Sequence, residues 1–387
     1  MPGPWLVRST GTDLLSADEP AAVAEDGAVA VLIAVDAPDQ TAGGLDELER
    51  LAETDGVAVV GRLSQACDEP DPATYLGSGE VAELADLVHD HGAGMVIADG
   101  ELSPAQVRNL EDRVGARVVD RTALILDIFG QHARSPEGRA LVELAQLAYQ
   151  LPRLRGQSAQ LSRVEGGRVA GGAGIGVRGP GEQRLETERR QLRRRMTLLR
   201  RQVADTGRRS ARIRARRRRT PVPCVALTGY TNAGKSALLN RLTGADVPVQ
   251  DALFATPDPA VRRTRTAAGR PYTLTDTVGF VRHLPHQLVG AFRSTLEEVV
   301  DADLVVHVVD ASAADAMAQV TTVRDVLAET GIHDHAELLA LNKVDAAPPE
   351  RVAALRSAYP HAVTVSALTG DGVAELRAAI DRALPAS

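Results

Sequence analysis

The sequence has very little cysteine, no long hydrophobic run and no recognisable export signal. Two cysteines among 387 residues, Cys67 and Cys224, cannot form a disulfide framework or a zinc site, which favours a reducing, cytoplasmic setting. The longest apolar run, Ala28–Val35, has eight residues, whereas a membrane span needs about twenty, so we expect no stable membrane insertion. The first residues lack a basic segment followed by an apolar core, so no signal peptide is expected.

Aromatic residues and lysine are also scarce. Aromatics make up 3% of the chain, so base-stacking platforms are not expected to dominate any RNA binding. Of the 44 basic residues, 42 are arginine, and the two lysines are Lys235 and Lys343. Because arginine serves here wherever any cation suffices, each lysine marks a place where a compact charge on a flexible stem is needed.

The net charge of −7 conceals three segments of opposite sign. Residues 1–150 carry 9 basic and 27 acidic side chains, residues 151–219 carry 21 and 5, and residues 220–387 carry 14 and 19. A basic block of net +16 between acidic ones indicates an anionic partner such as nucleic acid. Charge by itself fits a solvated helix face at least as well.

The first part of the chain alternates between apolar strands and amphipathic helices. Ser103, followed by Pro104 and by Gln106 three residues after the cap, predicts the start of one helix. The pattern predicts a small parallel sheet in a domain over residues 1–135. The expected strands are 28–36, 57–65, 95–98 and 116–120, and further expected helices are 45–54 and 79–91.

Residues 136–219 predict two antiparallel helices joined by a glycine-rich loop over 156–181. We expect the first helix at about 137–151, ended by Pro152, and the second from about Glu182, fraying near Gly207. Eight of the sixteen residues from Gly166 to Gly181 are glycine. The loop is either a plain linker, the simpler interpretation, or a flexible tip for a crowded site, which its flanking arginines favour. Those arginines are Arg163, Arg168, Arg178 and Arg184.

A phosphate-binding motif opens the last part of the chain, residues 220–387. An expected strand over 222–228 leads into GxxxxGKS and then a helix over 237–242, the setting that this motif requires. Backbone N–H groups and the helix N-terminus can hold phosphate oxygens, while Lys235 reaches the β- and γ-phosphates and Ser236 binds Mg²⁺. The predicted nucleotide-binding residues are Gly229, Tyr230, Thr231, Asn232, Ala233, Gly234, Lys235 and Ser236.

Three further motifs follow at the ends of expected strands 272–275, 338–341 and 363–365. The first should hold Mg²⁺ through water at Asp276 and sense the γ-phosphate at the Gly279 N–H. In the second, the Asp345 carboxylate selects guanine over adenine by accepting two hydrogen bonds. The third offers N–H groups to the guanine oxygen. The motifs are Asp276, Thr277, Val278, Gly279; Asn342, Lys343, Val344, Asp345; and Ser366, Ala367, Leu368.

Two catalytic roles stay open on spacing alone. A second hydroxyl ligand for Mg²⁺ is expected between the phosphate loop and Asp276, and Thr256, Thr231, Thr264 and Thr266 all qualify. The position directly after DxxG, where many GTPases have a water-orienting Gln, is Phe280. No catalytic residue is therefore identified, and slow hydrolysis by the free protein is expected.

Further signatures resemble the HflX family of translation-factor-like GTPases over roughly residues 55–370. They are YLGSGE at 75–80, ELSPAQVRNLE at 101–111, DRTALILDIF at 120–129, VELAQ at 142–146, and RGPGE at 178–182 with Leu185 and Glu186. The resemblance implies an α/β protein with a small parallel-sheet domain (1–135), an antiparallel helical pair (136–219) and a C-terminal P-loop GTPase domain (220–387). It also implies that the protein binds GTP and GDP with Mg²⁺ and hydrolyses GTP.

The resemblance implies partners and further site residues as well. It implies binding to the large ribosomal subunit and its rRNA, and splitting of stalled or stress-arrested ribosomes by a cytoplasmic protein that is a monomer when free and associates peripherally with ribosomes. It places Phe254, Ala255, Thr256, Pro257 and Asp258 at the nucleotide, which selects Thr256 as the second Mg²⁺ ligand. The implied ribosome contacts are Arg168, Arg178, Gly179, Gly181 and Arg184.

Two other functions fit the same motifs. One is a signalling switch whose effector is a protein, with the basic helix facing an acidic partner. The other is an RNA-binding protein with a structural nucleotide. Both predict a nucleotide site, so only the dependence of ribosome binding on the nucleotide separates the three hypotheses.

Overall fold

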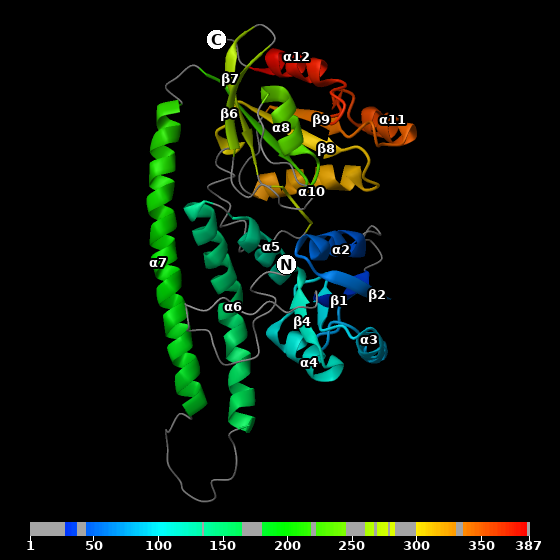
Figure 1. Cartoon of the computed structure of the whole chain (residues 1–387), viewed down its shortest axis with the longest axis vertical. Helices are drawn as coiled ribbons and strands as arrows, with labels where there is room; N and C mark the ends of the chain where they lie inside the picture. The colour runs from blue at the N-terminus through cyan, green and yellow to red at the C-terminus, as the bar shows by residue number, and fades with distance from the viewer. Residues whose placement is uncertain are drawn as a thin grey trace, which may run out of the picture. The chain divides into compact units, whose positions relative to one another are not determined.

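The computed structural model describes residues 28–36, 44–133, 135–164, 180–217, 222–244, 260–266, 269–277, 279–282, 299–329 and 336–384. For residues 155–164, 180–185, 209–217 and 260 the description covers the backbone. The chain divides into an N-terminal unit, Met1–Gln131 with Val142–Gln202, and a C-terminal unit, His132–Leu141 with Val203–Ser387 (Figure 1). The bounds of the three domains that the sequence predicts stay predictions.

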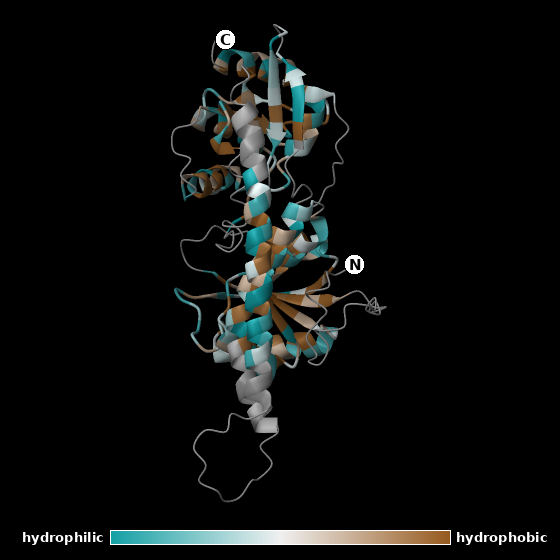
Figure 2. Cartoon of the chain, turned by 90° about the vertical axis from the view of Figure 1, so that its left-hand side faces the viewer, coloured by the Kyte–Doolittle hydropathy of each residue, from teal (hydrophilic) through white to brown (hydrophobic). Residues whose placement is uncertain are grey.

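The N-terminal unit contains a four-stranded parallel sheet in the order β2-β1-β3-β4, which confirms the predicted sheet. Its strands are predominantly hydrophobic (brown in Figure 2) because helices cover them. Val31 and Ile33 of β1 pack in one core cluster with α3 and α4, and Leu32 between them is buried as well. The elements are β1 Val29–Asp36, α2 Gly44–Thr54, β2 Ala58–Ala66, α3 Ser78–His91, β3 Met95–Ala98, α4 Pro104–Val114, β4 Arg117–Asp120 and α5 Arg121–His132.

The start of α4 confirms the predicted capping box. The Ser103 hydroxyl accepts a hydrogen bond from the Gln106 N–H at 3.2 Å, and the Gln106 side chain accepts one from the Ser103 N–H at 2.9 Å. Pro104 occupies the first helical position, where its missing N–H costs nothing. A local pattern of three residues thus sets where this helix begins.

The two long helices extend further than predicted. Helix α6 spans Pro136–Val164 and runs through Pro152, and α7 spans Pro180–Arg217 and runs through Gly207, so both predicted interruptions are wrong. A proline inside a helix costs about 3 kcal/mol and a glycine about 1 kcal/mol relative to alanine. Side-chain contacts on both sides of Pro152 offset the first cost, and good helix formers that follow Gly207, Arg208, Arg209 and Ala211, offset part of the second.

A single buried carboxylate anchors α6 to the sheet across Pro152. Asp120 accepts hydrogen bonds from the Tyr149 hydroxyl at 2.7 Å and from Arg153 Nη2 at 2.9 Å. It also accepts the N–H groups of Leu102 and Ala123, at 3.1 and 2.9 Å. The Arg153 guanidinium lies 3.4 Å from the centre of the Tyr149 ring. Tyr149, three residues before Pro152, and Arg153, directly after it, both bind the Asp120 carboxylate. These contacts hold the helix together on both sides of Pro152.

Helices α6 and α7 run antiparallel within the N-terminal unit, as predicted (Figure 1). Arg195 of α7 pairs with Glu143 of α6 through two hydrogen bonds of 2.6 and 2.8 Å. Met196 and Leu199 of α7 are buried. The remainder of the described part of α7 is largely hydrophilic and exposed (Figure 2).

The C-terminal unit contains a six-stranded sheet in the order β10-β9-β8-β5-β7-β6, in which only the β6–β7 pair is antiparallel. This mixed sheet agrees with the predicted P-loop GTPase domain. Its described elements are β5 Cys224–Gly229, α8 Lys235–Thr243, β6 Ala260–Arg265, β7 Pro271–Asp276, β8 Leu304–Asp310, α10 Ala316–Glu329, β9 Glu337–Asn342, α11 Pro349–Ala358, β10 Val363–Thr364 and α12 Val373–Ala383.

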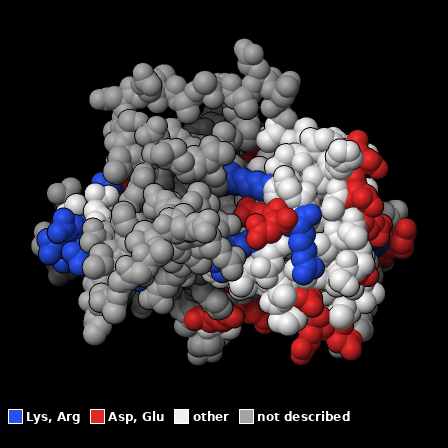
Figure 3. Space-filling model, turned by 90° about the horizontal axis from the view of Figure 1, so that it is seen from below, with Lys and Arg blue, Asp and Glu red and all other residues white. Residues whose placement is uncertain are grey.

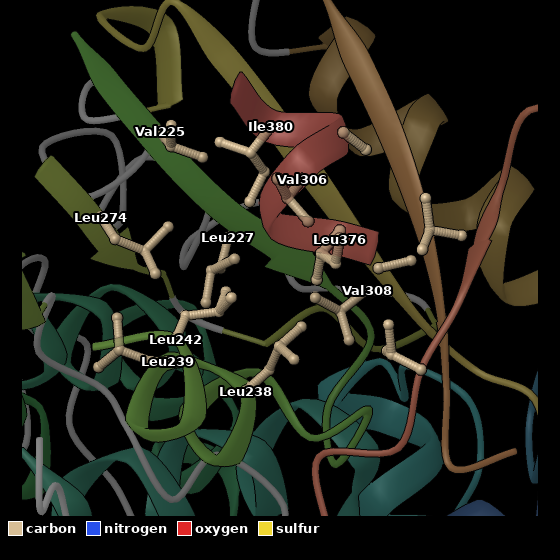
Figure 4. Packing of buried hydrophobic residues seen from close by; sticks show 14 of the residues in the cluster. Val225, Leu227, Leu238, Leu239, Leu242, Leu274, Val306, Val308, Leu376 and Ile380 are labelled. Atoms are coloured by element: carbon tan, nitrogen blue, oxygen red, sulfur yellow. The ribbon is translucent and has the colours of Figure 1, made fainter. Parts of the chain in front are cut away.

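Apolar side chains fill both faces of this second sheet. One core cluster joins strand residues such as Leu227 and Val308 to α8 and α12 through Leu239 and Ile380 (Figure 4). A second cluster joins β8 and β9 to α10 and α11. The parallel strands are therefore buried on both sides, and their carboxyl ends are free to present loops at one edge. In the described part of the chain, no helix has the length and apolar composition that crossing a membrane requires.

The Asp120 anchor yields a stability prediction. Asp120→Asn removes the charge that Arg153 pairs with, and breaking a buried ion pair costs about 3 kcal/mol. We expect amide hydrogen exchange in β3 and β4 to accelerate about a hundredfold. Glu143→Gln, which removes the partner of the half-exposed Arg195, should cost less than about 1 kcal/mol. Equal exchange in the two variants would show that Asp120 anchors nothing.

Candidate nucleotide-binding site

The phosphate-binding motif lies at the carboxyl end of β5, the central region of the sheet. Gly229 and Gly234 have φ values of 146° and 88°, and a Cβ at either would overlap neighbouring atoms, the Val308 carbonyl oxygen and the Asn342 side chain respectively. Asn232 has a φ of 58°, in the left-handed region that Asn tolerates. The loop therefore needs glycine at both positions, for reasons of backbone conformation and of space.

Lys235 begins α8 and folds back over this loop. Its ammonium group donates to the carbonyl oxygens of Gly229 at 3.1 Å and Tyr230 at 2.8 Å. Burial lowers the pKa of Lys235 to about 8, and the nearby Asp276 carboxylate opposes that shift. A buried ammonium group that donates to two carbonyl oxygens is suited to bind an anion, because a phosphate would replace part of the stabilisation that water gives an exposed cation.

Ser236 and Asp276 meet beside Lys235. The Ser236 hydroxyl donates to Asp276 Oδ2 at 2.6 Å, and Asp276 is fully buried. Burial raises the pKa of Asp276, while Lys235 and Ser236 oppose that shift. Among the residues that the structure describes, no group donates a hydrogen bond to Asp276 Oδ1. A hydroxyl beside a buried, unsatisfied carboxylate oxygen fits a hydrated Mg²⁺, which prefers oxygen ligands and keeps several of its waters.

Gly279 lies against the phosphate loop. A Cβ at Gly279 would stand 2.7 Å from Thr231 Cγ2, 2.8 Å from Thr231 Cα and 3.1 Å from Lys235 Nζ. The backbone continues along the loop, with the Thr231 N–H donating to the Phe280 carbonyl at 2.7 Å. The Phe280 side chain is buried, at 2% exposure. Its burial agrees with the expectation that Phe280 does not orient water.

Asn342 connects the phosphate loop to the third predicted motif. Its Nδ2 donates to the Ala233 carbonyl at 2.8 Å, and its Oδ1 accepts the Ala367 N–H at 3.0 Å. Lys343 has a φ of 62°, and its ammonium pairs with Asp310 Oδ2 at 2.8 Å. The structure thus brings three motifs that are far apart in the sequence to one edge of the sheet.

The remaining members of these two motifs line the same loops. Asp345 is exposed in the turn after β9, and Leu368 is 77% exposed. Ser366 is buried, and its hydroxyl accepts the Thr369 N–H at 3.0 Å. An exposed carboxylate and an exposed apolar side chain on these loops are suited to a base that is polar at its edge and apolar on its face.

Two residues that sequence reasoning missed support these loops. Arg241 of α8 donates from Nε to the Ala367 carbonyl at 2.9 Å and from Nη2 to the Leu368 carbonyl. Asp310, at the end of β8, holds Lys343 and accepts the Ser312 N–H at 2.9 Å. Both act across more than 30 residues of sequence, so no local pattern in one chain signals them.

The structure separates two of the rival Mg²⁺ ligands from the site. On β6, Ala260 lies opposite Asp276 and Thr264 opposite Tyr272, so Thr264 and Thr266 lie toward the far end of β7. The Thr266 hydroxyl accepts the Arg270 N–H there at 3.1 Å. Thr231 belongs to the phosphate loop, and its hydroxyl has no hydrogen-bond partner among the described residues.

Several predicted residues cannot be placed. Residues 254–258, with Thr256, and Val278 lie outside the described residues, as do Arg168, Arg178 and Gly179. Gly181 and Arg184 are described only as backbone in the first turns of α7. Their predicted roles stay predictions.

The fold and these loops define a P-loop GTPase, an enzyme that hydrolyses GTP. Three family profiles match the chain in order: "GTP-binding GTPase N-terminal" over residues 43–130, "GTP-binding GTPase Middle Region" over 132–217, and "50S ribosome-binding GTPase" over 224–343. The middle profile coincides closely with the two long helices, and the last begins at the first residue of β5.

Curated relatives agree along most of the chain. GTPase HflX of Caldanaerobacter subterraneus subsp. tengcongensis is 46% identical over 323 residues, 84% of this chain and 74% of that protein. GTPase HflX of Escherichia coli K12 is 42% identical, over 89% of this chain and 80% of its own length. A solved GTP-binding protein from Sulfolobus solfataricus in complex with GDP is 23% identical over 92% of this chain and 98% of its own, with a TM-score of 0.45. The chain belongs to the HflX family of GTPases, which confirms the resemblance.

The close approach at Gly279 predicts a strict size limit. Gly279→Ala would force its Cβ into Thr231 and toward Lys235. We expect affinity for a non-hydrolysable GTP analogue to fall at least about tenfold, since even a shift of the loop by a few tenths of an ångström disturbs its N–H groups. Gly79→Ala, on open space in α3, is the control and should bind like the wild type. Unchanged binding by Gly279→Ala would contradict the packing.

Proposed function

We propose that this GTPase binds the large ribosomal subunit in its GTP-bound state and splits stalled or stress-arrested ribosomes. The match to the family described as "50S ribosome-binding GTPase" supports the large ribosomal subunit as the binding partner. The observation that carries the proposal is the exposed arginine surface of α7. Both rival functions could use the same basic surface, so the dependence of ribosome binding on the nucleotide is what separates them.

Helix α7 carries far more positive charge than its own acidic residues can neutralise. Its sequence contains 14 arginines against four acidic residues. Where side chains are described, the ion pairs of this helix are formed at Glu186, at Asp205 and with Glu143 of α6. Four arginines are exposed and have no ion-pair partner among the described residues: Arg193, Arg194, Arg200 and Arg201. Such side chains suit phosphates, which guanidinium groups bind in a bidentate manner.

Helices α3 and α4 of the N-terminal unit carry exposed charge of the opposite sign. Acidic side chains are prominent on the face seen at the right of Figure 3. Exposed members on α3 and α4 are Glu83, Asp86, Asp90 and Asp112. A negative face repels RNA phosphates, so electrostatic contact with rRNA concentrates on α7 and on the adjoining glycine-rich loop. We assign the ribosome contacts to Arg168, Arg178, Gly179, Gly181 and Arg184 as well as to the exposed arginines of α7.

The nucleotide site has an assignable role for each loop. Lys235 would hold the β- and γ-phosphates, Gly279 N–H the γ-phosphate, and Asp345 the guanine edge. Ser236 and Thr256 would ligate Mg²⁺, and Asp276 would hold it through water. When bound, Mg²⁺ supplies charge stabilisation to the transferring phosphoryl group. The remaining assigned contacts are residues 229–234, 254–255, 257–258, 277–278, 342–344 and 366–368.

Hydrolysis needs an ordered water, and the described residues offer no side chain at the usual position. Phe280 has no hydrogen-bonding group and is buried. We propose that docking on the ribosome stiffens the segments around Thr256 and Gly279, beyond the contacts that the free protein already makes at Gly279 itself, and so orders the attacking water. The cysteine usage of the chain supports a cytoplasmic protein that associates peripherally with ribosomes, and we propose a monomer when free.

Co-sedimentation with purified large subunits tests the proposal. We expect the protein to bind with a GTP analogue and much less with GDP. Binding that ignores the nucleotide would support an RNA-binding protein with a structural nucleotide instead. No binding in either state would support a switch with a protein effector.

Asp345 predicts which base is accepted. Its carboxylate pairs with the N1–H and 2-amino donors of guanine, and Asp345→Asn turns one acceptor into a donor. We expect this variant to prefer xanthine over guanine nucleotides by about tenfold or more in equilibrium titrations. Asp371→Asn is the control, a carboxylate in the adjoining turn that accepts from Thr369. Wild-type protein that binds ATP as tightly as GTP would overturn the assignment.

The arginine surface predicts the salt dependence of ribosome binding. The double change Arg200→Gln and Arg201→Gln should lower affinity and reduce the slope of log affinity against log salt by about one to two. Arg356→Gln with Arg382→Gln removes the same charge from exposed positions on α11 and α12 and should change neither. Equal slopes for the two double variants would place the contact elsewhere.

A further inference from the structure

The hydroxyl of Tyr230 connects the phosphate loop to the residues that follow DxxG. Tyr230 is 5% exposed, and its oxygen accepts the Arg282 N–H at 2.8 Å. Arg282 is the sixth residue after Asp276, well past the end of β7. A side chain of the phosphate loop thus holds the backbone of a segment that itself lies beyond the sheet.

Backbone hydrogen bonds align the same two segments in parallel. Tyr230 and Phe280 form an isolated parallel bridge, in which the Phe280 N–H donates to the Gly229 carbonyl at 3.2 Å and the Thr231 N–H to the Phe280 carbonyl at 2.7 Å. Further back, Leu227 lies opposite Asp276. Between these two pairings the chain advances three residues from Leu227 to Tyr230 and four residues from Asp276 to Phe280.

Gly279 directly precedes the Phe280 bridge. It fills the tight space beside Thr231 and Lys235. The bridge holds Phe280, the residue after Gly279, against the phosphate loop. The Tyr230 hydroxyl binds the N–H of Arg282, two residues further on. The two hydrogen bonds of the bridge join backbone groups, whereas the one from the Arg282 N–H to Tyr230 uses a side chain.

We propose that Tyr230 is a positioning residue that fixes residues 280–282 on the phosphate loop and so presets the Gly279 N–H for the γ-phosphate. It sets the preference for GTP over GDP, because the γ-phosphate is the one group that distinguishes the two nucleotides. This inference rests on the proposed nucleotide site. A preset donor binds its ligand without an ordering cost, whereas a released segment must be ordered each time.

Tyr230→Phe tests the role, since it keeps the ring and removes one oxygen. A hydrogen bond of this kind contributes a factor of about three to ten. We expect affinity for a non-hydrolysable GTP analogue to fall by about that factor and GDP affinity to change less than about twofold. Amide exchange at residues 280–282 of the free protein should accelerate to a similar degree. Tyr272→Phe, which removes a hydroxyl from a ring that is 1% exposed in β7, should leave both affinities and the exchange at 280–282 unchanged.

The outcomes separate this inference from the site assignment. Equal losses of GTP-analogue and GDP affinity in Tyr230→Phe, or no loss of either, would overturn the positioning role. The site assignment fails instead if Lys235→Ala binds both nucleotides like the wild type. A GTP-analogue loss with unchanged exchange at 280–282 would also contradict the inference, because the hydroxyl would then act without holding that segment.

Discussion

The approach of Gly279 to the phosphate loop is the constraint on which the rest of the site depends. The gap at this point is too narrow for a Cβ, and two backbone hydrogen bonds and one tyrosine hydroxyl hold the two segments together. This packing buries Lys235 and Asp276 in one space, so each loses its water and depends on the other. Burial lowers the pKa of Lys235 to about 8, and a bound phosphate would oppose that shift by stabilising the protonated ammonium.

The two kinds of charge in this chain act in opposite environments. In the nucleotide site, a few buried groups are organised by short hydrogen bonds, so their geometry is fixed and salt screens them little. On α7, many exposed arginines lie on a helical surface where each contributes modestly and salt weakens all of them. The nucleotide site is therefore compact and fixed in geometry, whereas the α7 surface is extended and suited to an anionic partner such as the RNA that we propose.

The sequence predicted what local patterns determine. Strand–loop–helix spacing identified the phosphate loop, and Ser103 with Gln106 marked where α4 begins, because those signals lie within a few residues of each other. The prediction that Pro152 ends the helix was wrong because Asp120, some thirty residues earlier, binds Tyr149 and Arg153 on either side of it. Arg241 escaped notice for the same reason, since its carbonyl partners follow it by more than 120 residues. Contacts between distant segments determine the last two features, and such contacts cannot be predicted from local patterns in one sequence.

We propose that the nucleotide site is assembled within this chain and that docking on the ribosome orders the attacking water, since Phe280, directly after the DxxG motif, is buried and has no hydrogen-bonding group. Single-turnover hydrolysis of GTP by the wild-type protein, with and without purified large subunits, tests it most directly. The account predicts slow hydrolysis by the free protein and a large acceleration by the subunits. Equal rates in the two conditions would contradict it and would place the water-ordering group within the chain itself.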